Sequence, residues 1–256
     1  MLFRSLLGVY SIATAWAGLP AAVVTRVFST VLFPLLSRIH NEGTNFARTM
    51  PYTRRPWLIL AGWSTACLIS GGPFLIDLLY GAKAEAAGWI IRVLAVGVWL
   101  QSLEAANGIS LLALGQSKWL AVGNAAKLVG MVALIPLGFV GFGFPGAVVG
   151  FAAAELLHYA TTAVGAQRRK VACLRQDLRF SWLVVVTTAG GLAVAHWLAP
   201  LVRGLGLRPA KLGTFLELLI VALTASVAWG YAFRLHRRRW TRSERPTVVA
   251  EETRPA

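Results

Sequence analysis

The chain has 256 residues, of which 57% are hydrophobic and only 14% are charged, and its formal net charge is +15. This composition is too apolar for an ordinary soluble globular domain. The basic residues lie between long apolar stretches and not on a separate polar domain. We therefore expect anionic phospholipid headgroups as their counter-charge and no binding of nucleic acid.

Seven apolar stretches follow one another along the chain, each long enough for a helix to cross a bilayer, which takes about 20 residues. They run over Leu6–Leu36, Trp57–Leu79, Trp89–Leu114, Lys118–Val140, Gly143–Gly165, Ser181–Val202 and Gly213–Phe233. The sequence therefore predicts an all-α, polytopic bundle of about seven membrane-spanning helices over residues 1–235. Residues 236–256 are basic and then rich in Pro, Thr and Glu, and we expect a disordered cytoplasmic tail there.

The first stretch is longer than one crossing requires. As a helix it would extend about 46 Å, at about 1.5 Å per residue. Pro20 divides it into two halves that are each too short to cross the bilayer alone. We therefore expect one long helix that is kinked at Pro20.

The fourth and fifth stretches meet at a glycine-rich segment, where Gly141, Gly143 and Gly146 match the G-x-G-x-x-G pattern. No strand precedes this segment and no acidic residue follows about 20 positions later, so it is not a dinucleotide site. A tight outer turn between two transmembrane helices is expected instead. Gly146, Gly150 and Ala154 recur every four residues and predict a small-residue face for close helix contact.

The distribution of Lys and Arg predicts the orientation of the bundle. The connections and tail on one side carry 17 of these residues, and those on the other side carry five. Because cytoplasmic loops are enriched in Lys and Arg, the richer side, which includes the C-terminus, is predicted to be cytoplasmic.

Four charged residues fall well inside apolar stretches: Arg26, Glu104, Lys127 and Glu155. A charge in hydrocarbon costs at least about 2.5 kcal/mol, so each needs a partner or a wet cavity, and together they predict a transport pathway. Two interpretations of Arg26 remain open. Its planar guanidinium could hold a diphosphate headgroup in a cavity, or it could snorkel to the inner surface or pair with a carboxylate.

The other polar residues of the third to fifth stretches also allow two interpretations. An ion pair of Lys127 with Glu104 or Glu155 would lock adjacent helices, while a carboxylate left over would bind and release a proton or Na⁺. His158 shares a helical face with Glu155 and is either a proton relay or a packed neutral histidine. Asn107, one turn after Glu104, could bind sugar hydroxyls or hydrogen-bond a neighbouring helix. We predict ion coupling at Glu104, Glu155 and His158.

The sequence contains no sign of an enzyme. Cys67 and Cys173 stand apart and show neither metal-ligand spacing nor a disulfide framework. Hydrolase, metalloprotease and P-loop motifs are missing. We therefore expect no catalytic residue, no metal site and no cofactor.

Several helix ends and turns resemble those of a known family over about residues 6–235. Leu7–Arg38, Phe74–Gly81, Ala113–Lys118 and Leu134–Ala147 are similar to segments of the polysaccharide (O-antigen) flippases of the multidrug/oligosaccharidyl-lipid/polysaccharide exporter superfamily. In that family, two helical lobes surround a central cavity. The resemblance implies that undecaprenyl-diphosphate-linked oligosaccharide is moved across the bacterial inner membrane by alternating access.

The resemblance also implies partners and site residues. Cavity cations of the family are thought to meet the diphosphate, which suggests Arg26 and Lys127 as substrate-binding residues here, with Asn107 for the sugar. The chain matches the C-terminal lobe only, so we expect a fragment that needs an N-terminal lobe of the same protein, and the polysaccharide polymerase machinery is a possible further partner. The alternatives are a multidrug/cation antiporter of the same superfamily and a non-transporting membrane scaffold of a glycan assembly complex.

Overall fold

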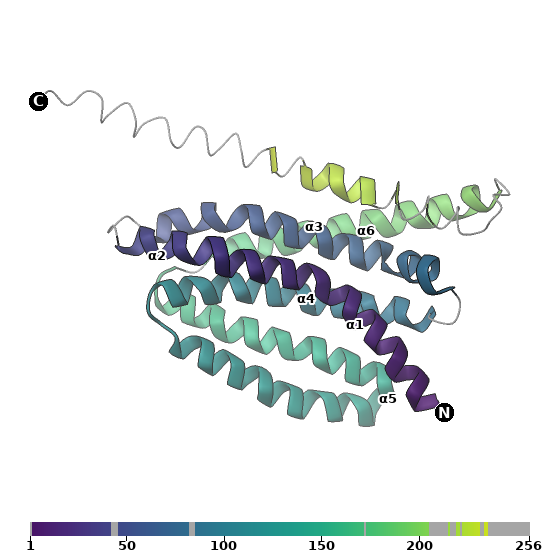
Figure 1. The fold of residues 1–256 in the computed structure, drawn as a ribbon, viewed down its shortest axis with the longest axis horizontal. Coiled ribbons are helices and arrows are strands. Elements are labelled where there is room, and N and C mark those ends of the chain that lie inside the picture. Colours follow the sequence, from purple (N-terminus) through teal and green to yellow (C-terminus); the bar gives the residue numbers. More distant parts are fainter. Residues whose placement is uncertain are drawn as a thin grey trace, which may run out of the picture.

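The computed structural model describes residues 2–41, 46–81, 85–171, 173–204, 215, 219–220, 222–230 and 233–234. These residues are almost entirely helical and include no strand, which confirms the all-α prediction (Figure 1). Four of the described helices are long and apolar enough to cross a membrane, and a shorter apolar helix covers Leu7–Val23.

The first predicted span forms three consecutive helical elements. These are α1 (Leu2–Val27), the π-helical segment η1 (Phe28–Leu32) and α2 (Phe33–Asn41). The helix continues through Pro20, and the change in its hydrogen-bonding pattern occurs eight residues later, in η1. A π-helical turn inserts an extra residue and often marks a functional position in a longer helix.

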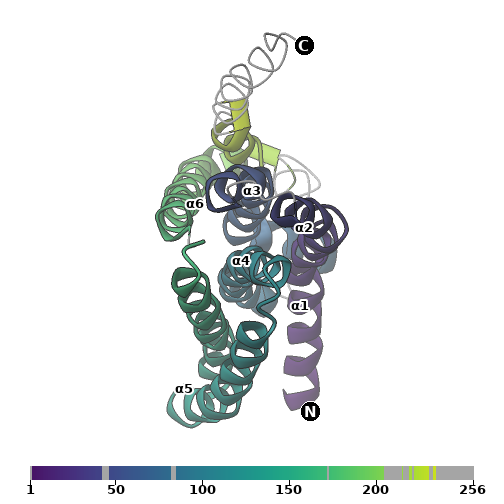
Figure 2. The same ribbon diagram turned by 90° about the vertical axis from the view of Figure 1, so that its left-hand side faces the viewer.

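The centre of the bundle is α4 (Glu85–Ala113), which packs against α1, α3 (Phe46–Tyr80) and α5 (Lys118–Arg168). The last long helix, α6 (Leu174–Gly204), packs against α3 (Figure 2). Two apolar clusters fill the contacts around α4. One includes Leu58, Leu103 and Trp99, and the other includes Ile76, Ile90 and Ile91.

The long helix α5 reverses direction at Gly143 and forms two antiparallel legs, as the sequence predicted (Figure 1). The reversal requires a φ of 65° at Gly143, a conformation that residues with a Cβ rarely adopt. The legs are so close that a Cβ at Gly150 would collide with the backbone of Leu134, and one at Gly130 would overlap Leu157. The small-residue face predicted from Gly146, Gly150 and Ala154 is therefore the contact between the two legs.

The end of α2, the start of α3, the α4–α5 turn and the start of α6 lie at the same end of the bundle (Figure 1). We call it the basic end, because its exposed residues include Lys118, Arg169, Lys170 and Arg175. The last predicted span and the tail of residues 236–256 lie largely or wholly outside the described residues. Residues 222–230 are helical, and Trp229 is buried there against Phe180 of α6.

The close contact within α5 predicts a sharp difference between two glycines. Gly150→Ala should destabilise the protein by about 3 kcal/mol, because neither backbone can move away in a packed hairpin. The melting temperature of the purified protein in detergent should therefore fall by roughly 10 °C. Gly141→Ala is the control, because a Cβ there meets nothing within 4 Å. Equal melting temperatures for the two variants would contradict the hairpin.

Candidate functional site

The side of α1 that points away from the other described helices carries small and polar residues together with the exposed Leu7, Leu19 and Val23. Ala13 and Ala17 are buried on its inner face, among the residues of α4. On the opposite face, residues spaced three, four and seven apart are mostly exposed, namely Ser11, Thr14, Ala15, Gly18, Ala22, Thr25 and Arg26. A Cβ added at Gly18 would meet no atom within 4 Å, so this face is not covered by the described part of the chain.

The outer surface of α5 is different in kind. Its most exposed large side chains are apolar, with Val132 69%, Val140 85% and Phe142 82% accessible. Large aliphatic and aromatic side chains suit contact with lipid tails, whereas Ser, Thr and Arg do not. The outward side of α1 therefore differs from the outer surface of α5 by its exposed Ser, Thr and Arg side chains, which lie beside Leu19 and Val23.

Arg26 lies on this face, at the last turn of α1 before η1. Its side chain is exposed, and its backbone carbonyl accepts hydrogen bonds from Ser29 Oγ at 3.0 Å and Thr30 Oγ1 at 2.7 Å. These two hydroxyls satisfy a carbonyl at the point where the regular helical pattern changes. Arg26 therefore exposes its guanidinium beside an irregular helical turn.

A second set of predicted residues meets at the contact between α4 and α5. Lys127 Nζ lies 2.5 Å from Glu155 Oε1, so these two residues form an ion pair between the legs of α5. His158 Nε2 lies 3.4 Å from Glu104 Oε1, and His158 Nδ1 lies 3.8 Å from Glu155 Oε2. The imidazole thus stands between two carboxylates, and the four side chains form one group that we call the midspan cluster.

The midspan cluster has a partly unsatisfied interior. Glu155 Oε2 and His158 Nδ1 are buried and have no hydrogen-bond partner among the described residues. Two carboxylates, one ammonium and one neutral imidazole together carry a net charge of −1. The group is therefore electroneutral when it holds one more proton. One further proton on the group would cancel its net charge and supply a hydrogen-bond donor beside Glu155 Oε2.

A third polar group was not predicted, and it joins four helices near the basic end. Arg54 Nη2 on α3 lies 2.6 Å from Asp177 Oδ1 on α6, and both side chains are almost fully buried. Arg54 Nη1 donates to Asn107 Oδ1 on α4 at 3.1 Å. The hydroxyl of Tyr159 on α5 donates to Asp177 Oδ2 at 2.9 Å. We call this set the Arg54 cluster.

This cluster bears on the prediction for Asn107 and on the charge count of the connections. Asn107 is 1% exposed, and its amide oxygen already accepts from Arg54. The predicted span begins at Trp57 and so places Arg54 in a cytoplasmic connection, but α3 begins at Phe46 and Arg54 lies inside the helix. A sequence signal did exist: Asp177 is an isolated acid between Arg175 and Arg179.

Cys173 lies beside the Arg54 cluster, just before α6, and is buried with its Sγ 3.7 Å from Met50 Sδ. Burial raises the pKa of this thiol, an effect that the neighbouring Arg54 only partly opposes. Because the thiolate is the reactive species, Cys173 should react slowly with thiol reagents at neutral pH.

Comparison with known proteins gives two matches. Residues 1–86 match the family model described as "Polysaccharide biosynthesis protein", which is about a third of the chain. The structure of "Lipid II flippase MurJ, inward closed conformation" matches with a TM-score of 0.60 at 13% sequence identity. The fold is MurJ-like. The resemblance to the flippases that was seen in the sequence is therefore confirmed.

The extent of the structural match is uneven between the two proteins. It covers 87% of this chain but 47% of the MurJ chain, so this chain spans about half the length of that flippase. No curated protein sequence matches the chain. No group of three or more His, Cys, Asp or Glu side chains that could hold a metal ion occurs in the described part of the chain.

Removing one partner of the buried ion pair should open the Arg54 cluster. Asp177→Ala leaves the buried charge of Arg54 uncompensated, which should cost about 3–5 kcal/mol. In a Cys67→Ala background, we expect maleimide to label Cys173 at least about tenfold faster in this variant, because 1.4 kcal/mol of opening free energy already gives a factor of ten. Arg179→Ala, an exposed change two residues away, should leave the rate unchanged. Equal labelling rates would show that the pair does not hold α3 and α6 together.

Proposed function

We propose that this chain forms one lobe of a transporter that moves a lipid-linked oligosaccharide across the bacterial inner membrane by alternating access. The substrate class is undecaprenyl-diphosphate-linked sugar, as in the polysaccharide flippases that the sequence resembles. The family match over residues 1–86 and the MurJ-like fold support this proposal. A transport role and not a catalytic one is proposed.

The observation that carries the proposal is the outward face of α1. It exposes Arg26, Thr25 and Ser11 beside Leu19 and Val23, whereas the most exposed large side chains of α5 are Val and Phe. A second lobe facing α1 across a wet cavity would give these polar groups the environment that they need. The second lobe belongs to the same full-length protein in this proposal.

Arg26 is the residue that we assign to the diphosphate. Its guanidinium can donate two parallel hydrogen bonds to phosphate oxygens, and a cavity that excludes bulk water would strengthen both. Lys127 is 21% exposed and already paired with Glu155, and Asn107 is buried in the Arg54 cluster. Their role in substrate binding therefore requires that these contacts rearrange during transport.

The midspan cluster is the proposed coupling site. In this proposal Glu104, Glu155 and His158 together hold one exchangeable proton, and Lys127 pairs with Oε1 of Glu155. Because α4 packs on both α1 and α5, protonation at the cluster could change how α4 supports the outward face of α1. The coupling ion in this proposal is a proton.

The orientation and the partners complete the proposal. The basic end faces the cytoplasm, together with the C-terminus, in accordance with the excess of Lys and Arg on that side. Anionic phospholipids then surround the exposed cations of the basic end. The polysaccharide polymerase machinery is the partner that would receive the translocated substrate.

Bulk added to the outward face of α1 should block transport without unfolding the lobe. Gly18→Leu in the complete native protein should abolish surface polysaccharide in a strain that lacks the chromosomal gene. The side chain has open space within this lobe and would meet only a second lobe or the substrate. Gly190→Leu on α6 is the matched control, because it too has nothing within 4 Å. Both variants should reach normal levels in the membrane. Normal polysaccharide with Gly18→Leu would place this face in lipid and refute the proposal.

Charge removal separates a transporter from a scaffold. Arg26→Gln and Glu104→Gln should each lower surface polysaccharide more than about tenfold, while Arg26→Lys should retain part of the activity because it keeps the charge. A membrane scaffold would tolerate all three changes. If the protein were a multidrug/cation antiporter, the variants would instead lose efflux of a cationic dye. Deletion of the gene would then leave surface polysaccharide unchanged.

A further inference from the structure

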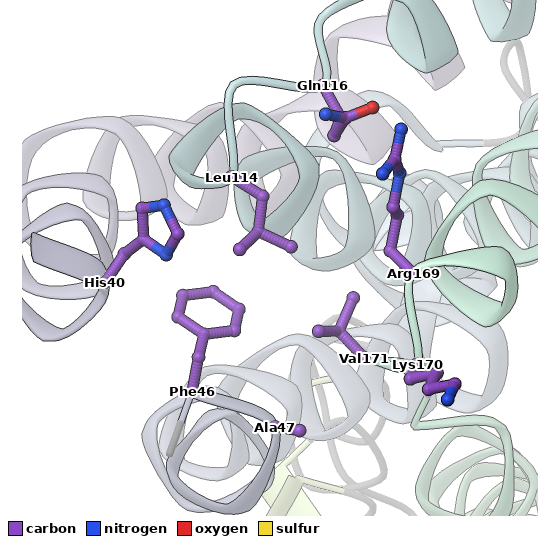
Figure 3. Close-up of a pocket in the computed structure, with 8 residues that line it drawn as sticks. All are labelled: His40, Phe46, Ala47, Leu114, Gln116, Arg169, Lys170 and Val171. Carbon is purple, nitrogen blue, oxygen red and sulfur yellow. The ribbon is translucent and has the colours of Figure 1, made fainter. Parts of the chain in front are cut away.

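A separate cavity of about 390 Å³ opens at the basic end, where three connections meet (Figure 3). Its lining comes from the end of α2, the start of α3, the α4–α5 turn and the α5–α6 turn. The volume lies within the range of about 300–1,000 Å³ that is usual for small-ligand sites. The cavity includes no residue of the outward face of α1 and none of the midspan cluster, so it is a different place from the proposed cargo site.

The lining combines an apolar floor with a cationic rim. Phe46, Leu114 and Val171 point toward one another in the centre of the view, and Arg169 lies beside Gln116 at one edge (Figure 3). Lys170 belongs to the same rim, and His40 lies on the opposite side. None of the lining residues is acidic. This pattern suits a ligand with an anionic group next to an apolar part.

The cations at this rim differ from the neighbouring arginines, whose side chains make contacts within the fold. Arg168 stacks on the ring of Trp119 at 5.3 Å, and Arg54 is paired with Asp177. Arg169 and Lys170 form no ion pair with a carboxylate of the described residues, and both side chains are exposed. They are therefore available to a ligand.

Lys170 supplies a second, independent observation, because it has a φ of 60°. Two helices end at this cavity in the same hydrogen-bonded turn. In α4 the amide of Gln116 donates to Leu111 O, and in α5 the amide of Val171 donates to Ala166 O. This turn places one residue in the left-handed region, where glycine is usual. The first turn has Gly115 there, with a φ of 68°, but the second has Lys170.

A lysine at such a position is disfavoured relative to glycine, and strain of this kind tends to be retained at functional sites. Lys170 adds a second cation to the part of the lining that the α5–α6 turn provides, beside Arg169. We propose that this cavity binds a phosphate group attached to an apolar body. An anionic phospholipid of the inner leaflet and a free phosphate are the two sources of that chemistry, and the apolar floor favours the lipid.

The test measures the melting temperature of the purified full chain with three probes: dioctanoyl phosphatidylglycerol, dioctanoylglycerol and inorganic phosphate. The phosphatidylglycerol should raise the melting temperature by at least about 5 °C at a hundredfold excess over its Kd. Dioctanoylglycerol, which lacks the phosphate, should not. An equal rise with inorganic phosphate would identify free phosphate as the ligand source.

Two variants make the assignment specific. Arg169→Gln should remove most of the rise, while Arg175→Gln, the same charge change at an exposed residue outside the cavity, should keep it. Lys170→Gly should raise the melting temperature without ligand by about 2–4 °C, because it relieves the left-handed strain, and it should also reduce the shift that the phosphatidylglycerol causes. No shift with any phosphate probe, or equal losses in Arg169→Gln and Arg175→Gln, would overturn the proposal.

Discussion

The buried ion pair between Arg54 and Asp177 is the contact on which the arrangement of the bundle depends. In a bilayer, a charge without a partner costs several kcal/mol, so the two side chains can be accommodated only together. Asn107 and Tyr159 supply further hydrogen bonds to the pair, and in this way one polar group ties α3, α4, α5 and α6 at a single level. The ends of these helices are thereby held near the cavity at the basic end.

The two legs of α5 approach each other through close packing of small residues, which is a different kind of contact from the buried ion pair. Facing glycines let the two legs approach until backbone meets backbone, and the large apolar side chains are left on the outside. Van der Waals contact between small residues is the main attraction available to helices whose surroundings are as apolar as themselves. The midspan cluster sits on this rigid hairpin, so the carboxylate of Glu155 and the imidazole of His158 are held beside Glu104 of the central helix.

The described lobe thus keeps its polar groups in three places with different surroundings. The Arg54 cluster is closed and almost fully satisfied by hydrogen bonds. The midspan cluster is buried but has two polar atoms without partners. The outward face of α1 is open. The three groups therefore differ in how far the described bundle satisfies their polar atoms.

The sequence by itself determined the elements that follow from hydropathy and local geometry. Apolar length predicts the helices, Gly143 predicts the reversal in α5, and turn residues together with apolar pattern suffice for the resemblance to the flippases. The sequence also marks Arg26, Glu104, Lys127 and Glu155 as unusual, because a charge inside an apolar stretch is costly wherever the helix packs.

Only the tertiary structure decided which polar groups meet. Arg54 and Asp177 are 123 positions apart, and both lie outside the predicted spans Trp57–Leu79 and Ser181–Val202. Equally, Lys127 could have paired with Glu104 or Glu155, and the packing of the two α5 legs selects Glu155. The reason is physical: helical periodicity fixes which residues share a face, but the rotation and depth of one helix against another are set by side-chain packing, which no single segment encodes.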